Sequence, residues 1–348
     1  MTKVNSPPRA LGYRMPAEWE PHEATWLAWR HDQETWPHEL PLVESTYLDI
    51  IEHLHKGERV HVLVEDSSSE ARVLEKLGRK GVTENILIHQ VKTDSIWIRD
   101  YGPTFLVHKQ GQTASSDWIF NAWGRKYAAY QEDDQVPGRI SDLVPGPRFQ
   151  VDMVLEGGAI DVNGLGTCLL TEQCLLNPNR NPSLSRMGIE RNLRDYVGVS
   201  HFIWLSRGLS CDDTDGHVDT VARFISPSAV VAALDWNERN PNYSLLKENW
   251  EKLIESVDQD GFRLNIVTLP MPEPVMIDGV RFPASYANFY IGNSVVLVPV
   301  YDCKSDRIAL DILNAWFPDR DVVGIDSKAL VRGLGGIHCI THEQPACP

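Results

Sequence analysis

Apolar positions in this chain follow two spacings that alternate along the sequence. Between Leu42 and His55 the apolar side chains fall three or four residues apart, which is the period of an α-helix with one buried face. The segments that follow predict a strand from Arg59 to Glu65, a short helix from Glu70 to Leu77 and a second strand from Asn85 to Val91, because β-branched and other apolar residues dominate the two strands. This order of strand, helix and strand indicates an α/β fold.

The same order continues through the chain, and many predicted strands come in adjacent pairs. Gly-containing turns separate two such pairs, at Asp161 to Gly164 and at Ile291 to Asn293, as in β-hairpins. A purely parallel, doubly wound sheet would contain fewer hairpins. The further strands are expected at Ser95 to His108, Val151 to Val162, Thr167 to Leu176, His201 to Leu205, His217 to Leu234, Leu264 to Leu269, Tyr286 to Pro299 and Val322 to Ile325. The further helices are expected at Ser183 to Tyr196, Tyr243 to Val257 and Asp306 to Trp316.

No long flexible linker divides these segments. The best candidate, Gln131 to Pro147, is acidic and rich in Pro and Gly, but it is no longer than a surface loop. We therefore predict a single domain over residues 1–348, built from repeated units of a hairpin and a helix.

Composition excludes several classes of protein. Hydrophobic residues make up 42% and charged residues 23% of the 348 residues, as in ordinary globular proteins. The formal net charge of -15 argues against a nucleic-acid partner, which would require clustered Lys and Arg, and it mildly favours the approach of a small cation. The longest apolar runs, such as Ser294 to Val300, are too short to span a membrane, so no membrane partner is expected.

The six cysteines have no regular spacing, and the N-terminal segment is polar and Pro-rich. This usage predicts reduced thiols and a cytoplasmic location. Five of the six are expected to be small buried hydrophobes. Cys339 differs, because the glycine-rich stretch from Gly333 to Gly336 precedes it and lets the backbone bend sharply and approach a ligand. We expect a buried thiol that solvent can reach, presented from a turn beside a short strand.

Candidate partners for this thiol lie in three other segments. Asp100 ends an apolar and polar alternation at Gly102-Pro103, so it is expected at the rim of a strand. The alternative is a structural role, as an ion pair with Arg99 or a turn cap, and this segment alone favours that alternative. Glu156 precedes Gly157-Gly158, and a salt bridge is as well supported there as a functional role.

His217 and Asp219 are two residues apart, so in a strand they would face the same side. Such a pair forms a buried hydrogen bond, a metal site or a catalytic base with its carboxylate neighbour. Further ligands at recognisable spacing are not evident, which disfavours the metal.

Together, a thiol, a histidine and several carboxylates favour a cationic carbon electrophile. A thiolate attacks carbon, and carboxylates in a poorly hydrated site bind cations strongly. A guanidinium group is planar and pairs bidentately with carboxylates. An amide or peptide hydrolase would instead need donors for an oxyanion, which three carboxylates oppose.

Five motifs in this order resemble the agmatine deiminases and the related bacterial peptidylarginine-deiminase-type proteins, over essentially the whole chain. The motifs are Ile98-Arg99-Asp100-Tyr101-Gly102-Pro103-Thr104, Phe120-Asn121-Ala122-Trp123-Gly124, Glu156-Gly157-Gly158, Gly216-His217-Val218-Asp219 and Gly335-Gly336-Ile337-His338-Cys339-Ile340-Thr341. The resemblance implies the pentein fold, a pseudo-fivefold α/β propeller of ββαβ-type units around a central pocket. It also implies homo-oligomers for many relatives.

The resemblance implies a role for each polar group. Cys339 would be the nucleophile and His217 the general acid and base, while Asp100 and Asp219 would hold the guanidinium group. Glu156 would support this clamp or orient His217. Trp97 is our candidate for a pocket wall.

The expected reaction is the hydrolysis of agmatine to N-carbamoylputrescine and ammonia, without a cofactor or a metal. Deimination of peptidylarginine or free arginine to citrulline, amidino transfer, and silent guanidine binding are the alternatives. The chain departs from the resemblance at Leu334 and Gly336, where a third glycine and an asparagine are usual, and at Arg30, where proline is common.

Overall fold

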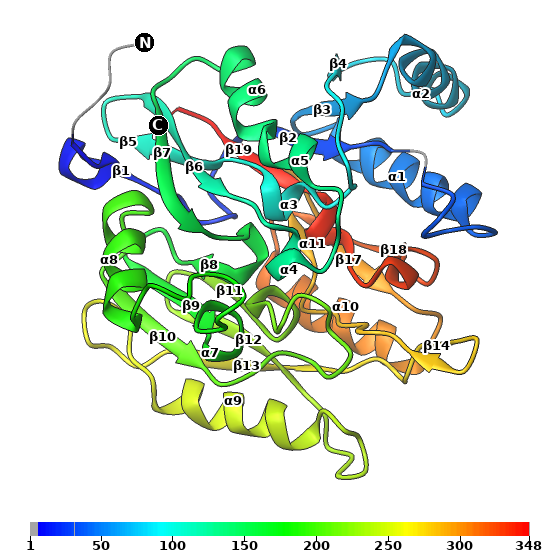
Figure 1. Cartoon of the computed structure of the whole chain (residues 1–348). Helices are drawn as coiled ribbons and strands as arrows, with labels where there is room; N and C mark the ends of the chain where they lie inside the picture. The colour runs from blue at the N-terminus through cyan, green and yellow to red at the C-terminus, as the bar shows by residue number, and fades with distance from the viewer. Residues whose placement is uncertain (1–5, 31, 348) are drawn as a thin grey trace.

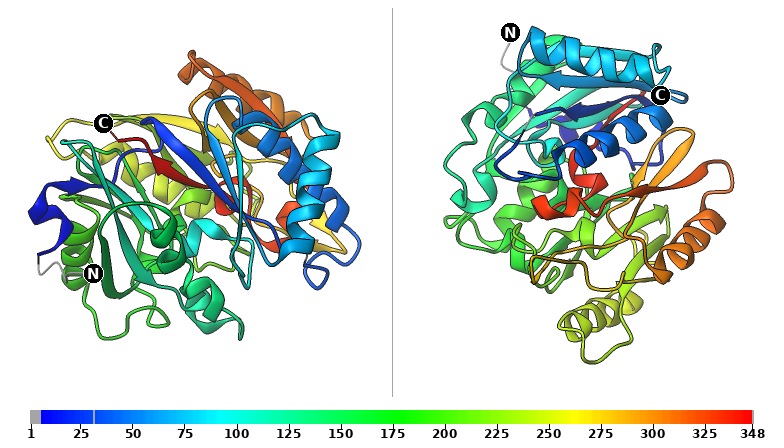
Figure 2. Two further views of the ribbon diagram at one scale, coloured as in Figure 1. Left: turned by 90° about the horizontal axis from the view of Figure 1, so that it is seen from above. Right: turned by 90° about the vertical axis from the view of Figure 1, so that its right-hand side faces the viewer.

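The computed structural model describes residues 6–30 and 32–347. It is a mixed α/β fold in which small sheets and their helices surround a group of short helical turns (Figure 1). Two further views show the longer helices on the outside of the molecule (Figure 2).

Five sheets among the described residues share one plan. Each contains an antiparallel pair of strands, which is a hairpin in four sheets and joins the two ends of the chain in the fifth. The second strand of the pair continues through helix into a third strand that pairs parallel to it. This arrangement confirms the predicted combination of hairpins with helices, because a hairpin needs only a tight turn whereas a parallel pair needs a long crossover.

The first of these sheets contains β5 (Thr104–His108), β6 (Gln112–Ile119) and β7 (Arg148–Val154), with β1 (Tyr13–Arg14) beside β5 and with α5 (Gln131–Asp134) and α6 (Val136–Leu143) before β7. The second contains β8 (Ile160–Val162), β9 (Thr167–Thr171) and β10 (His201–Leu205), with α7 (Glu172–Leu175) and α8 (Arg186–Tyr196) before β10. The third contains β11 (Ala222–Ser226), β12 (Ala229–Leu234) and β13 (Asn265–Pro270), with α9 (Tyr243–Glu255) before β13.

The fourth sheet contains β16 (Tyr290–Ile291), β17 (Val295–Val300) and β18 (Asp321–Asp326), with α10 (Lys304–Trp316) before β18. The fifth sheet joins segments near both ends of the described chain and contains β19 (His342–Pro345), β2 (His22–Ala28) and β3 (Arg59–Val64), with α1 (Leu40–Leu54) before β3. Helix α2 (Ser67–Arg79) then leads to a fourth strand, β4 (Ile86–Gln90), which pairs with β3. A separate small pair contains β14 (Met276–Ile277) and β15 (Val280–Arg281). The remaining short turns are η1 (Pro8–Leu11), α3 (Ile98–Tyr101), α4 (Ala122–Arg125), η2 (Gly157–Ala159), η3 (Val218–Thr220), η4 (Leu330–Gly333) and α11 (Ile337–Ile340).

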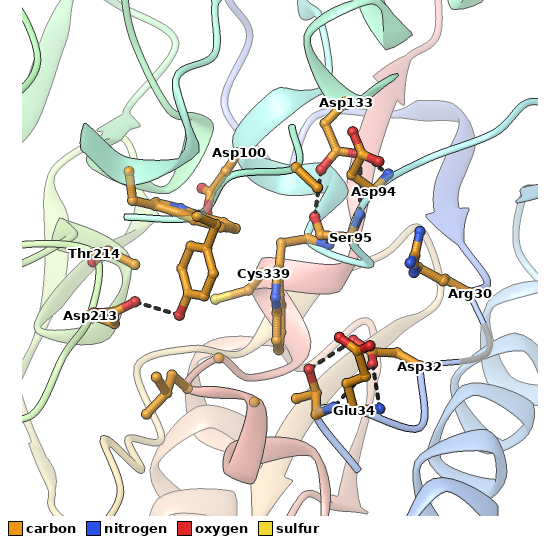
Figure 3. A pocket seen from close by; sticks show the side chains of 18 of the residues that line it. Arg30, Asp32, Glu34, Asp94, Ser95, Asp100, Asp133, Asp213, Thr214 and Cys339 are labelled. Atoms are coloured by element: carbon orange, nitrogen blue, oxygen red, sulfur yellow. Dashed lines mark hydrogen bonds between the residues drawn. The ribbon is translucent and has the colours of Figure 1, made fainter. Parts of the chain in front are cut away.

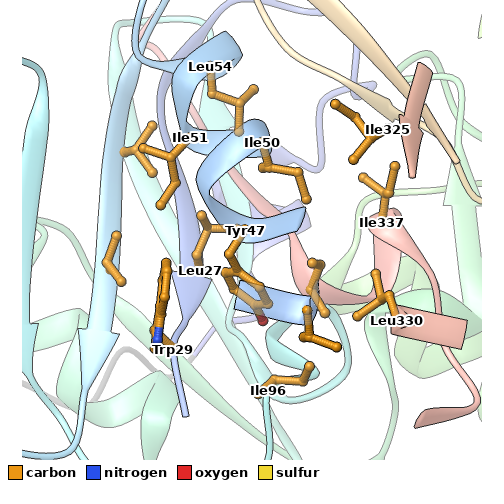
Figure 4. Packing of buried hydrophobic residues seen from close by; sticks show 14 of the residues in the cluster. Leu27, Trp29, Tyr47, Ile50, Ile51, Leu54, Ile96, Ile325, Leu330 and Ile337 are labelled. Atoms are coloured by element: carbon orange, nitrogen blue, oxygen red, sulfur yellow. The ribbon is translucent and has the colours of Figure 1, made fainter. Parts of the chain in front are cut away.

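A buried apolar cluster supports the turn that carries Cys339. Helix α1 turns Tyr47, Ile50 and Ile51 inward, and the same cluster contains Ile337 and Ile340 of α11. Figure 4 shows Ile50 on the side of α1 toward Ile325 and Ile337, and Ile51 on the opposite side of the helix. The four-residue helix α11 is too short to be stable alone, so this packing and the surrounding hydrogen bonds hold it in place.

The long elements follow the sequence predictions closely, whereas four predicted strands contain helical turns. In the strand predicted at Val151 to Val162 this turn is η2. The first half of Ser95 to His108 forms α3, because the Gly102-Pro103 pair ends the segment and Pro103 has no N–H for a strand ladder. His217 to Leu234 begins with η3, and Thr167 to Leu176 ends in α7. His217 and Asp219 therefore do not share a strand face, and that reasoning was wrong.

Two smaller expectations also need correction. Residues 131–147 form α5 and α6 over most of their length rather than a plain loop. Among the cysteines expected to be buried, Cys211 and Cys347 are exposed and Cys303 is half-buried.

Within the part of the chain that the structure describes, no helix has the length and apolar character needed to cross a bilayer.

Candidate active site

The candidate site is built from the segments that precede the first strand of the antiparallel pair in each of the five sheets. Turn α3 precedes β5, η2 precedes β8, η3 precedes β11 and α11 precedes β19; α11 contacts α3, α3 contacts η2, and η2 contacts η3. The fifth such segment, residues 285–289, precedes β16. The five segments carry Asp100, Glu156 with Gly158, His217 with Asp219, Cys339 and Asn288.

Cys339 presents a protonated thiol to this group. Its Sγ lies 3.4 Å from Nδ2 of Asn288 and 3.9 Å from Oδ2 of Asp219. Oδ1 of Asn288 also accepts a hydrogen bond from the backbone N–H of His338 at 3.0 Å, so one amide side chain fixes both the turn and the thiol. Burial, together with the charges of Asp219 and Asp100, raises the pKa of the Cys339 thiol well above its usual value.

Asp100 is buried, with 3% of its surface exposed, and does not lie at an exposed rim. Its Oδ2 accepts a hydrogen bond from Nε1 of Trp123 at 2.9 Å, and its Oδ1 accepts one from the backbone N–H of Gly158 at 3.0 Å. Burial raises the pKa of this carboxyl group, while the nearby His217 and the Trp123 bond counteract the rise. The alternative of an ion pair with Arg99 is wrong, because Arg99 pairs with Glu18 and Glu343.

His217 is completely buried between two carboxylates. Its Nδ1 lies 3.5 Å from Oδ1 of Asp100 and its Nε2 lies 3.8 Å from Oε2 of Glu156. Within the described part of the chain, neither ring nitrogen has a hydrogen-bond partner. Burial opposes protonation, but the charge of Asp100 and the neighbouring Cys174 and Glu156 outweigh it and raise the pKa of His217 well above its ordinary value. The ring can therefore donate a proton to a group that enters the site.

A neighbouring histidine, His338, favours the ionised form of Asp219. Its Oδ2 lies 2.8 Å from Nδ1 of His338, and Nε2 of His338 lies 2.8 Å from Oε2 of Glu18. Burial alone would raise the pKa of Asp219, but His338 outweighs it and the pKa is lowered. The other oxygen, Oδ1, is buried and has no hydrogen-bond partner among the described residues, so it is available to a cationic donor.

Glu156 is both a salt-bridge partner and a neighbour of His217, so both possibilities left open for it are present. Its Oε1 accepts a hydrogen bond from Nε of Arg180 at 2.6 Å, and Oε2 faces His217. Arg180 outweighs the effect of burial and lowers the pKa of Glu156. A second buried ion network, formed by Glu18, Arg99, Arg223, Asp161 and Glu343, lies behind Asp219 and His338.

A cavity of about 470 Å³ leads to Cys339 and Asp100, and Trp97 and Trp123 line it. The ring of Trp97 packs so closely on the glycine turn that a Cβ at Gly335 would overlap it. Figure 3 shows Cys339 in the middle of this pocket, with Asp100 and Thr214 on one side and Arg30, Asp32 and Glu34 further out. His217, Asp219 and Glu156 lie behind this surface and do not line the cavity.

The cavity wall carries six carboxylates against two guanidinium groups. The carboxylates belong to Asp32, Glu34, Asp94, Asp100, Asp133 and Asp213, and the guanidinium groups to Arg30 and Arg332. Burial raises the pKa of Asp133 to about 7, so its charge varies near neutrality. The wall favours a cationic ligand along its whole length.

The structure thus brings together five of the six predicted residues, and Trp97 lines the entrance. Four polar residues that complete the site were not predicted. Trp123 and His338 stand inside the quoted motifs, whereas nothing local in the sequence marks Asn288 or Arg180.

Similarity to known proteins covers the whole chain. Residues 14–345 match the family of Porphyromonas-type peptidyl-arginine deiminases. An agmatine deiminase of Pseudomonas aeruginosa is 38% identical over 369 residues, which cover 99% of both chains. The structure of agmatine deiminase from Enterococcus faecalis, 32% identical, superposes with a TM-score of 0.92 over 99% of this chain and 98% of that chain. Agmatine deiminase from C. jejuni, 29% identical, gives a TM-score of 0.84 over 96% and 97%. The chain therefore belongs to the Porphyromonas-type peptidyl-arginine deiminase family.

Proposed function

We propose that this protein hydrolyses agmatine to N-carbamoylputrescine and ammonia through a covalent amidino intermediate on Cys339. The observation that carries the proposal is the position of Sγ of Cys339 beside two buried carboxylates, Asp219 and Asp100, with a buried histidine behind them. The names of the similar proteins support the same activity.

The guanidinium group is bound by the two carboxylates. Oδ1 of Asp219 has no partner among the described residues, and Asp100 keeps its orientation through Trp123 and Gly158. A planar guanidinium group donates several N–H bonds in one plane, so two carboxylates hold it with its central carbon toward the sulfur of Cys339. Trp97 forms a wall of the approach.

Substrate binding generates the thiolate. In the free protein burial and the surrounding carboxylates raise the pKa of the Cys339 thiol and keep it protonated. A bound cation neutralises these carboxylates, so the thiol proton leaves to solvent at lower pH than in the free protein. The thiolate then attacks the central carbon and forms a neutral tetrahedral adduct.

His217 acts as the acid and then as the base. Its raised pKa keeps the ring protonated before the reaction, so it protonates the amino group of the adduct, which departs as ammonia and leaves a thiouronium group on Cys339. The neutral ring then takes a proton from water as the water attacks the thiouronium carbon. Collapse of this second adduct forms the urea group of the product and releases the sulfur, which recovers a proton from the adduct hydroxyl group. Glu156, fixed by Arg180, keeps the ring in place.

Agmatine fits the cavity better than arginine does. Agmatine ends in an ammonium group, whereas free arginine adds an α-carboxylate that the acidic wall would repel. The test is ammonia release with agmatine, free arginine and a short arginine peptide at equal concentration, with Cys339→Ala as the control. We expect agmatine to give the highest kcat/KM, by at least about tenfold, since 1.4 kcal/mol of repulsion is sufficient for this ratio. A preference for arginine or the peptide, or undiminished ammonia release by Cys339→Ala, would contradict the proposal.

We also propose that residues 1–348 form one catalytic deiminase domain with the pseudo-fivefold pentein architecture. The five sheets of one plan and the five segments that converge on the site support this proposal. A cytoplasmic location is supported by the six free thiols. The expected lack of nucleic-acid and membrane partners and the expected homo-oligomer stay predictions.

A further inference from the structure

A second thiol lies behind the proposed catalytic histidine and has no part in the mechanism. Cys174 is completely buried in α7, and Oγ1 of Thr171 accepts a hydrogen bond from its backbone N–H at 3.2 Å. Its Sγ lies 4.0 Å from Oε2 of Glu156, the same oxygen that lies 3.8 Å from Nε2 of His217. One thiol, one carboxylate oxygen and one imidazole nitrogen therefore form a compact triangle, within 4.8 Å of one another.

We propose that Glu156, Cys174 and His217 form a binding site for a thiophilic divalent cation of the Zn²⁺ type, and that a cation bound there inhibits deimination. The inhibition rests on the proposed function of His217; the binding does not.

The donor set and its spacing suit tetrahedral zinc. Sulfur, imidazole and carboxylate ligands lie about 2.0–2.3 Å from the metal, so two ligands of a tetrahedron are roughly 3.5 Å apart. The observed 3.8 Å and 4.0 Å need only small side-chain movements. Three protein ligands leave the fourth position to water. On binding, the thiol of Cys174 and the protonated ring of His217 each release one proton to solvent, and the resulting thiolate and the carboxylate of Glu156 balance the two positive charges of the cation.

The groups around the triangle orient its ligands. Arg180 donates to Oε1 of Glu156, which leaves Oε2 directed at the triangle. Oδ1 of Asp100 lies 3.5 Å from Nδ1 of His217, the nitrogen on the far side of the ring from Glu156. A carboxylate behind a metal-binding histidine fixes the ring and raises its basicity. The unpartnered nitrogens of this buried ring are the second observation that indicates a ligand.

The inhibitory effect follows from occupation of Nε2 of His217. The other ring nitrogen, Nδ1, faces Asp100 and the proposed guanidinium site. A cation on Nε2 takes the place of the proton there, so the ring is no longer an imidazolium, and its Nδ1–H is a far weaker acid toward the departing amino group. Substrate and metal are also both cations that need the carboxylates around His217, so they exclude one another. The acidic cavity that leads to Asp100 is a path for either of them.

Metal binding is tested directly on the full chain. Serine replaces the exposed Cys211 and Cys347 in every protein, so that surface thiols do not contribute. Zn²⁺ affinity is measured by competition with a chromophoric chelator, and Co²⁺ is used as a second probe because thiolate coordination gives a charge-transfer absorption. The compared proteins are this parent, Cys174→Ala, Cys174→Ser and Cys339→Ala.

We expect one tight site in the parent and in Cys339→Ala, and at least a tenfold loss of affinity together with loss of the charge-transfer band in both Cys174 variants. Circular dichroism confirms that each variant is folded, and the serine variant keeps the test valid if alanine disturbs the packing. The opposite pattern, with binding lost in Cys339→Ala and kept in the Cys174 variants, would overturn the proposal and place the cation on the nucleophile. Equal weak binding in all proteins would overturn it as well.

Inhibition is measured separately as the Zn²⁺ concentration that halves ammonia release at several agmatine concentrations. We expect this concentration to rise with agmatine and to be at least tenfold higher in Cys174→Ser than in the parent, relative to the activity of each protein without metal. A parent that binds Zn²⁺ at Cys174 but releases no ammonia from agmatine would refute the proposed function and leave the metal site standing.

Discussion

Trp123→Phe removes one N–H donor from the proposed guanidinium clamp and little else. The indole Nε1 donates to Oδ2 of Asp100 at 2.9 Å, while the backbone N–H of Gly158 holds the other oxygen. A hydrogen bond to a charged group contributes about 1.5–3 kcal/mol, which equals a factor of about 10 to 150 in kcat/KM. Trp123 lines the cavity, so a water molecule can enter beside the smaller ring and replace part of the bond. We therefore expect a loss of about tenfold.

The same variant has a predicted pH signature. Asp100 must be ionised to bind a guanidinium group, and burial already raises its pKa. The Trp123 bond lowers that pKa, so its removal raises the pKa further. As the pH is lowered, Asp100 of the variant therefore becomes protonated at a higher pH than Asp100 of the parent protein. The acid limb of kcat/KM moves to higher pH.

The assay is steady-state ammonia release from agmatine across the acid limb. Trp118→Phe is the matched control, because Trp118 is also buried but its Nε1 donates to the neutral Oγ1 of Thr104 at 2.9 Å. The reasoning is refuted if Trp123→Phe keeps kcat/KM within twofold of the parent with an unmoved acid limb, or if Trp118→Phe shows the same loss and the same shift.

Two further substitutions test the packing of the site and of the buried ions. Gly158→Ala would place a Cβ 2.6 Å from Nδ1 of His217, so we expect kcat/KM to fall by about 10²-fold. The control is Gly78→Ala in α2, where no atom lies within 4 Å of the added Cβ and activity should stay unchanged. Equal activity of the two variants would contradict the geometry. Arg223→Met removes the guanidinium group that pairs with two buried carboxylates, Asp161 and Glu18, of which Glu18 keeps Arg99 as a partner. It should lower the free energy of unfolding in urea by about 3–5 kcal/mol, against about 0.5 kcal/mol or less for Arg79→Met in an exposed pair. Similar unfolding midpoints for both variants would show that the buried network contributes nothing.

Sequence periodicity predicted the long elements because each has a continuous buried face. Helix α1 shows this in Val43, Tyr47 and Ile50, which recur at helical spacing and are buried. Strand β10 has the predicted bounds, His201–Leu205. In such elements the local sequence pattern and the burial of side chains favour the same secondary structure.

The short turns at the site were not predictable in this way. A helix of four residues, such as α3 or α11, is too short to show a period, and its hydrogen bonds depend on distant residues. Arg99 in α3 donates to the backbone carbonyl of His338 in α11 at 3.2 Å, a contact between segments more than two hundred residues apart. At α3 the sequence suggested a strand because Ile98 is β-branched, and at α11 it suggested a turn beside a short strand.

The reactive residue types of the site were visible in the sequence, whereas their supports were not. A cysteine, a histidine and carboxylates near glycines are recognisable candidates. Trp123 becomes a hydrogen-bond donor to Asp100 only because Ala122, Trp123 and Gly124 all have positive φ, of 54°, 51° and 91°. Only glycine adopts such angles without strain, so local backbone preferences do not predict these conformations at Ala122 and Trp123. Asn288 reaches Cys339 through the packing of two separate sheets.

The most direct test of the central claim is the mass of the intact protein after rapid acid quench during turnover of agmatine. The parent protein should carry an adduct that corresponds to agmatine minus ammonia, and peptide mapping should place it on Cys339. Cys339→Ala should carry no adduct, and His217→Asn should accumulate little, because the amino group of the tetrahedral adduct is not protonated and cannot depart as ammonia. Rapid ammonia release by the parent protein without any adduct at the shortest quench times, or an adduct of the same mass in Cys339→Ala, would contradict covalent catalysis by this cysteine.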